Sequence, residues 1–485
     1  MKPTVANPIQ TTAENKSGFF ISVGCPGCGG SLELQENFFV LTCPHCSSAL
    51  RITMPETPPA YMIPARKSKR EIRFLIDRHL KEKRLPLTGT DIHYKYIYYP
   101  YWKVDYIALK KRNKIIERHV SDQYQANSYG PVTNEQVSRQ EKVTDISLTA
   151  TSLSRAAGIE QECIPWSNGM KTDYISVVPF SRENIDEEYE CFPVQISWPD
   201  VRDAIEKSVK GQDSLNSADF GYNKTRLFRM AGSIVYQPYI ISECGSGGKF
   251  RLFVSDAVTG RIVYSTEKDE PFEEIQPGDD PDFEFGQLGV DFHRCLTCGV
   301  DLPTIQSYVY ICGNCQEMTM MELNPLLDKT LKSIQPPDRS SANKFFPFWS
   351  MTITSEEARS LKRMFGGLHD SDRLVIPAFK GKNHEALFRL AKRMSAAYPK
   401  FRLEQVEDAL DENFLPATVG IHEAITLAAI LIHREKSHRS KDIDDDDIYF
   451  EPMNVELFYA PFRMEHYFMV DSVLGAVTFE KNIMD

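Results

Sequence analysis

The stretch YYPYW occupies residues 98–102, and FFPFW repeats it almost letter for letter at residues 345–349. Proline cannot donate a hydrogen bond to a neighbouring strand, so each run is expected to lie at the edge of a sheet or to begin there. The aromatic rings bury a large area, and core packing is their default role. A peptide-binding groove beside the edge strand is the alternative role.

Further matches follow the two aromatic runs in the same order along the chain. The matched pairs are Pro193 and Pro416, VYQPYII at 235–241 and FYAPFRM at 458–464, Asp256 and Asp471, and Gly260 and Gly475. The aspartates and glycines suit a hairpin turn, because Asp caps a turn and Gly accepts a positive φ. Ordered matches of this kind predict a tandem duplication, in which YYPYW occurs twice because the whole module does.

Eight of the eleven cysteines form two sets of paired Cys-x-x-Cys motifs. A turn with two thiolates three positions apart offers two corners of a tetrahedral metal site, and a second turn completes a four-thiolate zinc site. The predicted ligands are Cys25, Cys28, Cys43 and Cys46 in the first set, and Cys295, Cys298, Cys312 and Cys315 in the second. Gly29 and Gly299 suit the left-handed backbone that follows such a turn. We therefore expect two structural Zn²⁺ ions per chain.

The segments between the motifs, SLELQENFFVLT and VDLPTIQSYVYI, each hold two short apolar runs around a polar turn. This pattern predicts a hairpin between the two Cys-x-x-Cys turns. These stretches resemble the zinc-ribbon superfamily, and the resemblance covers the ribbons alone. It implies a structural zinc finger whose surface contacts proteins or nucleic acids. The rival interpretation, thioredoxin-type redox chemistry, uses one Cys-x-x-Cys at a helix N-terminus and fits two pairs on strands poorly.

Charge is unevenly distributed in a chain whose net charge is −11. This balance argues against a protein whose whole surface follows nucleic acid, but it allows a local basic patch. We expect a basic amphipathic helix within residues 64–88, with Ile72 and Ile76 on its apolar face. The predicted partner-binding residues are Arg73, Arg78, Lys81, Lys83 and Arg84. Phosphate, an anionic membrane surface or an acidic protein are candidate partners. Alternatively, the helix is solvated and neutralised by the acidic segment 267–290.

The predicted fold class is α+β, with each zinc ribbon followed by an α+β domain around a mainly antiparallel sheet. Ser197 predicts a helix N-cap, with Pro199 in the first turn and an end before Gly211. The expected segments are a mobile tail at 1–17, a zinc ribbon at 18–53, the basic helix at 64–88, a first module at 89–266, an acidic linker at 267–290, a second ribbon at 291–322 and a second module at 340–485.

Catalytic and targeting signals are incomplete. GSGGKF at 245–250 lacks the residues of a phosphate loop, and IHEAIT at 421–426 has Thr426 where a zincin helix needs its second histidine. We find no apolar run that spans a bilayer and no signal-peptide core, which favours a cytoplasmic protein, with peripheral membrane contact still open.

The leading hypothesis is a non-enzymatic zinc-binding scaffold or adaptor that recruits a protein partner through ribbons and edge strands. One alternative is a nucleic-acid-binding accessory factor that uses the first ribbon and residues 66–84. The other is an enzyme with an unrecognised site in the α+β modules, since catalytic groups can be scattered along a sequence.

Overall fold

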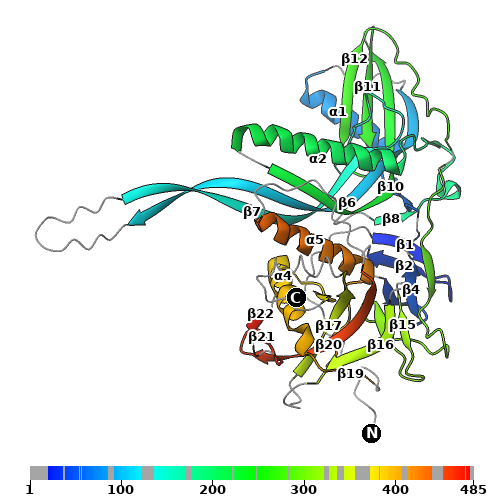
Figure 1. Ribbon diagram of the computed structural model, residues 1–485. Helices are drawn as coiled ribbons and strands as arrows, with labels where there is room; N and C mark the ends of the chain where they lie inside the picture. Colours follow the sequence, from blue (N-terminus) through cyan, green and yellow to red (C-terminus); the bar gives the residue numbers. More distant parts are fainter. Residues whose placement is uncertain are drawn as a thin grey trace, which may run out of the picture.

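The chain folds as an α+β protein, as predicted (Figure 1). The predicted tail at 1–17 lies outside the residues that the structure describes. No helix in the described part of the chain is both long and apolar enough to cross a bilayer. The computed structural model describes residues 20–35, 39–53, 55, 57–85, 92–121, 136–169, 176–220, 223–246, 248–281, 283–321, 327–335, 343–354, 372–381, 383–406, 413–439, 452–473, 475 and 477–480.

The first half is built on a ten-stranded sheet. Its strands are β1 (Phe20–Gly24), β2 (Ser31–Gln35), β5 (Ala60–Met62), β6 (Ile92–Ser121), β7 (Gln136–Ala156), β8 (Ser176–Pro179), β9 (Tyr189–Cys191), β10 (Asn223–Ser246), β11 (Lys249–Asp256) and β12 (Ile262–Lys268). Its helices are α1 (Lys69–Glu82), η2 (Arg182–Asn184) and α2 (Trp198–Phe220). The strand order β12-β11-β10-β5-β8-β1-β2 includes the hairpin of the first cysteine motif, so the expected ribbon and the first module share one sheet.

The second half is built on a seven-stranded sheet with a helix on each face. Its strands are β16 (Leu327–Ile334), β17 (Asn343–Thr352), β18 (Arg373–Pro377), β19 (Leu403–Gln405), β20 (Asn454–Glu465), β21 (Phe468–Asp471) and β22 (Val477–Glu480). Its helices are α4 (His384–Ala397), η3 (Tyr398–Lys400) and α5 (Ile421–Arg439). Successive side chains on β17 point to opposite faces. Phe348 therefore packs with α4, whereas Trp349 packs with α5.

The strands of two small sheets flank three of the four Cys-x-x-Cys motifs. The first has the order β13-β4-β3, and the second pairs β14 with β15. Their strands are β3 (Val40–Thr42), β4 (Ala49–Thr53), β13 (Gly289–Phe292), β14 (Val309–Ile311) and β15 (Met318–Met320). Across the structure, four strand pairings are parallel and the others described are antiparallel, so the sheets are mixed.

The two aromatic runs occupy corresponding places in their halves. Trp102 Nε1 donates to Ile196 O, and Trp349 Nε1 donates to Val419 O, each at 2.8 Å. In both halves the accepting carbonyl lies two residues before the first residue of a helix, α2 or α5. The proline two residues before each tryptophan is paired with a tyrosine of the neighbouring long strand. The same local architecture thus surrounds both runs.

The prediction that the proline-containing strands lie at sheet edges is wrong. β6 pairs with β10 on one side, and with β9 and then β7 on the other. Pro100 lies where β9 has ended and β7 begins, and its carbonyl accepts a hydrogen bond from Ala157 N at 2.9 Å. Pro347 is related in the same way to Ala378 N, also at 2.9 Å. The missing N–H falls at an interruption in the pairing, which explains why proline is tolerated inside these sheets.

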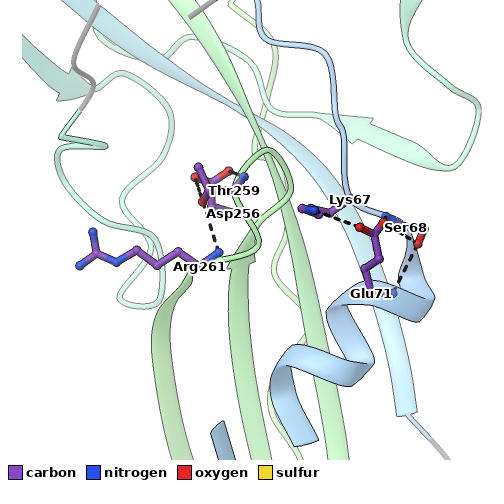
Figure 2. A network of polar contacts seen from close by, with 6 residues as sticks. All are labelled: Lys67, Ser68, Glu71, Asp256, Thr259 and Arg261. Carbon is purple, nitrogen blue, oxygen red and sulfur yellow. Dashed lines mark hydrogen bonds and ion pairs between the residues drawn. The ribbon is translucent and has the colours of Figure 1, made fainter. Parts of the chain in front are cut away.

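Helix α1 confirms the predicted basic helix over a shorter range, with residues 86–88 outside the described part of the chain. It begins after Ser68 because of a capping box (Figure 2). Glu71 N–H donates to Ser68 Oγ at 3.4 Å, and Ser68 N–H donates to Glu71 Oε2 at 3.0 Å. The buried residues Ile72, Ile76 and Leu80 pack on β10 and β11.

The β11–β12 turn fixes the chain just before α1 and confirms the predicted roles of Asp256 and Gly260. Asp256 Oδ1 accepts Val258 N–H at 2.7 Å, and Gly260 has φ of 78°. Figure 2 shows this turn beside the start of α1. The N–H groups of Arg66 and Lys67 both donate to Ala257 O, at 2.9 and 2.8 Å. These bonds hold residues 66 and 67 outside the helix.

The structure adds detail to two other sequence expectations, the extent of helix α2 and the contacts of the acidic segment. Helix α2 is capped by Ser197, as predicted, but it continues through Gly211 to Phe220 because a solvent-exposed glycine only weakens a helix. The acidic segment 267–290 lies along the first half, where Glu274 pairs with Lys95 at 3.4 Å and Asp280 pairs with Arg182. These contacts do not join the acidic segment to the basic helix.

Candidate metal centres

The first cysteine unit (residues 20–53) and the second cysteine unit (residues 289–321) each carry their motifs on tight turns. β1 pairs with β2, and β3 pairs with β4, so in the first unit a hairpin encloses each Cys-x-x-Cys turn. The expected hairpin between the two turns is therefore wrong. In the second unit, residues 302–308 form no strand. Pro303 and the outward contacts of Gln306 with the first unit account for this departure.

All four turns have the same backbone geometry. The residue after the second cysteine has a positive φ, of 73° at Gly29, 60° at Ser47, 74° at Gly299 and 60° at Gln316. Its N–H donates to the carbonyl of the first cysteine at 2.9 Å in every case. The sequence indicated the two glycines but missed Ser47 and Gln316, because a left-handed serine or glutamine has no distinctive pattern.

The sulfur atoms of each unit converge. The four Sγ atoms of each set lie within 4.8 Å of one another, and these are the two candidate metal clusters among the described residues. The Sγ–Sγ separation is 3.8 Å for Cys25–Cys46 and for Cys28–Cys43, 3.6 Å for Cys295–Cys315 and 3.5 Å for Cys298–Cys312. A disulfide needs about 2.05 Å. Tetrahedral zinc with Zn–S bonds of about 2.3 Å places sulfurs about 3.8 Å apart. The predicted ligand sets therefore fit a tetrahedral metal ion.

The thiols of each unit differ in acidity. Hydrogen bonding by the side chain and backbone of Ser48 lowers the pKa of Cys46 to about 6, and backbone N–H groups, Cys298 first, lower the pKa of Cys295 to about 6. Cys28 accepts a backbone hydrogen bond that favours its thiolate, but desolvation and the neighbouring sulfurs raise its pKa to about 12. Four thiolates cannot coexist at this spacing without a cation, and a bound divalent ion would supply the missing charge.

Each motif anchors its first cysteine in a core and leaves its second nearer the solvent. Cys25, Cys43, Cys295 and Cys312 are buried, whereas Cys28, Cys46 and Cys298 are exposed and Cys315 is intermediate. Four protein sulfurs would complete the tetrahedral shell of a bound ion. The chemistry of such a site is structural, because no position is left for water or substrate.

The two cysteine units are joined to each other, which the sequence did not predict. β13 pairs with β4, from Gly289 opposite Thr53 to Phe292 opposite Leu50. The side chain of Gln306 accepts from Phe39 N at 3.1 Å and donates to Val40 O at 2.5 Å. Val40 also packs with Cys295, Leu302, Tyr310 and Cys312 in one buried cluster. The two units thus form a single body between the halves.

The predicted partner-binding cations lie away from the cysteine units. Arg73, Arg78 and Lys81 are on α1, Lys83 is its C-cap, and Arg84 follows with φ of 56°. Arg73 is half-buried and the others are exposed. Helix α1 packs over β10 and β11, whereas β1 of the first unit lies beyond β5 and β8 in the strand order. These two predicted contact regions are therefore built on different parts of the same sheet.

Two other polar or hollow regions bear on the enzyme hypothesis. Glu456, 2% exposed, pairs with Lys332 at 2.7 Å and Arg373 at 3.1 Å and also bonds Tyr398. Those partners neutralise the carboxylate. A cleft of about 280 Å³ lies between β5, β8 and residues 285–288, and Arg182 is its one charged lining residue. Neither region gathers several titratable groups around an open space.

Comparison with protein families, with curated proteins and with solved structures found no match.

Proposed function

We propose that this chain is a non-enzymatic scaffold or adaptor in the cytoplasm, in which two structural Zn²⁺ ions fix the cysteine units and the units hold the two halves together. The β4–β13 pairing carries this proposal, because it makes one continuous sheet from strands of both cysteine units. A closed four-thiolate site favours a structural ion over a catalytic one, and the Cys-x-x-Cys spacing favours zinc. The function is then to present surfaces of both halves to a protein partner.

We also infer that the two halves arose by tandem duplication. The matched tryptophan hydrogen bonds support this inference, and so do the closing turns. Gly260 N–H donates to Asp256 O, and Gly475 N–H donates to Asp471 O, each at 2.8 Å. Both glycines have a positive φ, of 78° and 65°. The two turns therefore share their hydrogen bond, their backbone geometry and their residue types.

Native mass spectrometry of the protein, purified gently from its own cells, tests the scaffold proposal. The expected mass is one chain plus two zinc ions, with added mass from a bound protein at low salt. Denaturing the same sample should release both ions, as a colorimetric chelator can measure. One zinc ion or none per folded chain would contradict the structural role of the metal. A fully zinc-loaded chain without any protein partner would contradict the adaptor role.

A second candidate function is that of a nucleic-acid-binding accessory factor using residues 66–84 and the first cysteine unit. The packing of α1 favours it, because the apolar face is buried on β10 and β11 and the basic residues face outward. Phe74, 67% exposed, lies one helical turn from both Arg70 and Arg78, which suits stacking between phosphate contacts. The same packing argues against insertion of α1 into a membrane, because β10 and β11 already cover its apolar face.

The test neutralises four cations of α1 and its C-terminal end, as Arg73→Gln, Arg78→Gln, Lys81→Gln and Arg84→Gln together. If they contact phosphates, the slope of log affinity against log salt for single-stranded RNA should become shallower by about 3. The matched control replaces exposed cations of the second half, as Lys380→Gln, Arg389→Gln, Lys400→Gln and Arg402→Gln. Equal effects of the two variants would rule out α1 as the contact surface.

A further inference from the structure

Strands β6 and β7 continue beyond the first sheet as a two-stranded projection. β10 accompanies β6 as far as Arg112, opposite Asn223, whereas β7 stays paired with β6 to Ser121, opposite Gln136. We call residues 110–121 and 136–147, with residues 223–226 at the base, the arm. Figure 1 shows the arm extending away from both halves. An isolated two-stranded ribbon is marginally stable in water, so an element of this length gains from a ligand.

The base of the arm is held firmly. Ile107, Leu109 and Leu148 pack with α5 in the large core of the second half. Arg229 on β10 also pairs with Glu423 on α5 at 2.6 Å. The arm therefore leaves the body from a fixed position, which reduces the entropy lost when it meets a partner.

The arm is cationic although the protein is acidic. It carries nine Lys or Arg residues against three Asp or Glu residues, in a chain of net charge −11. The nine are Lys110, Lys111, Arg112, Lys114, Arg118, Arg139, Lys142, Lys224 and Arg226, and the three are Glu117, Glu141 and Asp145. Such a concentration of one sign attracts a polyanion.

The strand register places like charges directly opposite each other at two positions of the arm, whereas Arg112 is opposite Asp145. Arg118 is opposite Arg139 across β6 and β7, and Lys111 is opposite Lys224 across β6 and β10. Like charges in directly opposite positions destabilise a sheet. Phosphate groups placed over the two like-charge pairs would lower this penalty, which adds to the attraction of the net positive charge for an anionic ligand.

We propose that the arm binds double-stranded DNA, with the two-stranded ribbon in the major groove and its cations against the phosphates. The major groove of B-form DNA is about 12 Å wide and admits a two-stranded ribbon. The deep, narrow major groove of double-stranded RNA does not. This proposal shares its ligand class with the second candidate function but uses a different site, and it does not depend on the adaptor role.

The experiment titrates full-length, zinc-loaded protein into a labelled DNA duplex between about 50 and 200 mM salt. The variant Lys114→Gln, Arg118→Gln, Arg139→Gln should make the slope of log affinity against log salt shallower by about 2.7, since each lost phosphate contact contributes about 0.9. The control Lys380→Gln, Lys400→Gln, Arg402→Gln changes the net charge equally and should keep the wild-type slope. The α1 variant described above should retain the contribution of the arm.

A second arm variant keeps the proposal testable if the first variant does not fold. Lys111→Gln with Lys224→Gln removes the other like-charge pair, so it should make the slope shallower by about 1.8 and raise the Tm of the unbound protein. Equal loss in the arm and control variants, equal affinity for duplex RNA, or no binding of DNA by the wild type would each overturn the proposal. Zinc content is measured on the same samples, so failure of DNA binding and failure of the scaffold are distinguished.

Discussion

Gly286, in the segment between the two halves, lies close against the backbone of residues 57–59. A Cβ atom at this position would lie 2.4 Å from Thr57 O and 2.4 Å from Pro55 Cβ. The Gly286 N–H also donates to Pro58 O at 3.1 Å, which fixes the approach. Gly286→Ala is therefore expected to lower the free energy of unfolding by about 1–3 kcal/mol, as overpacking does elsewhere. Urea unfolding followed by tryptophan fluorescence measures this change.

The matched control for this substitution is Gly211→Ala in helix α2. Apart from the local backbone of the helix, no described atom lies within 4 Å of a Cβ at Gly211, so the alanine fits without displacement. Alanine is favoured over glycine in a helix interior by about 0.5–1 kcal/mol. The two substitutions should therefore change stability in opposite directions, and a shift of the same sign in both would show that backbone crowding at Gly286 is not the cause.

At the residue scale, a site can be predicted from the sequence when all of its residues lie within a few positions of one another in short motifs. The eight cysteines could be assigned because two Cys-x-x-Cys turns per unit already define the four ligands. Gln306 could not be assigned, because its role depends on the backbone of Phe39 and Val40, which lie far away in the sequence. Local patterns carry no information about such a partner.

At the scale of elements, the docking of α1 on its sheet is expected to weaken at acidic pH. His79 contacts the Phe253 ring edge-on at 6.3 Å, and its Nε2 is buried without a hydrogen-bond partner in the described part of the chain. Burial, and to a lesser extent Lys83, lower its pKa, while Glu82 opposes them. A lowered pKa means that protonation favours the undocked state. The stabilisation is therefore complete above about pH 6.5 and declines as pH falls below it.

Hydrogen exchange of the α1 amides, corrected for intrinsic rates, measures this effect between about pH 7.5 and 5.5. Protection should fall across that range in the wild type and stay flat in His79→Phe, which keeps a ring against Phe253. Titration of Glu71 does not contribute to the pH dependence of this protection. Hydrogen bonds from the Ser68 backbone first, and then from Lys67, lower the pKa of Glu71 to about 2, so this carboxylate stays charged throughout. An unchanged pH dependence in His79→Phe would assign the effect to another group.

Elements differ in how far the sequence predicts them. Helix α1 could be found because Ile72, Ile76 and Leu80 recur at helical spacing beside basic residues. The aromatic strands were wrongly predicted to lie at sheet edges. That prediction assumed that a single strand pairs along each side of β6, whereas the neighbour on one side changes from β9 to β7 at Pro100. The length of the arm was missed, since basic residues mixed with isoleucines show neither a strand period nor a turn.

At the scale of the whole molecule, the two metal centres are expected to be coupled. The second unit contributes Gln306 and β13 to the first, and Val40 of the first unit lies in the core around Cys295 and Cys312. Loss of the first ion should disorder β3 and β4 and remove these contacts. Each lost hydrogen bond costs about 1 kcal/mol, so the second site is expected to weaken roughly tenfold or more.

Cys25→Ser with Cys28→Ser tests this coupling, because it removes two ligands of the first site and none of the second. Zinc release into a colorimetric chelator should show one ion instead of two, and that ion should leave roughly ten times faster than either ion of the wild type. Cys163→Ser is the control, since Cys163 is buried in the first half and lies outside both ligand sets. Linkage between binding free energies is reciprocal, so Cys295→Ser with Cys298→Ser should weaken the zinc affinity of the first site by a similar factor, which competition with the chelator measures. If each remaining ion instead leaves at the wild-type rate, the β4–β13 pairing and the Gln306 contacts do not transmit stability. The cysteine units would then be two independent sites that only lie side by side.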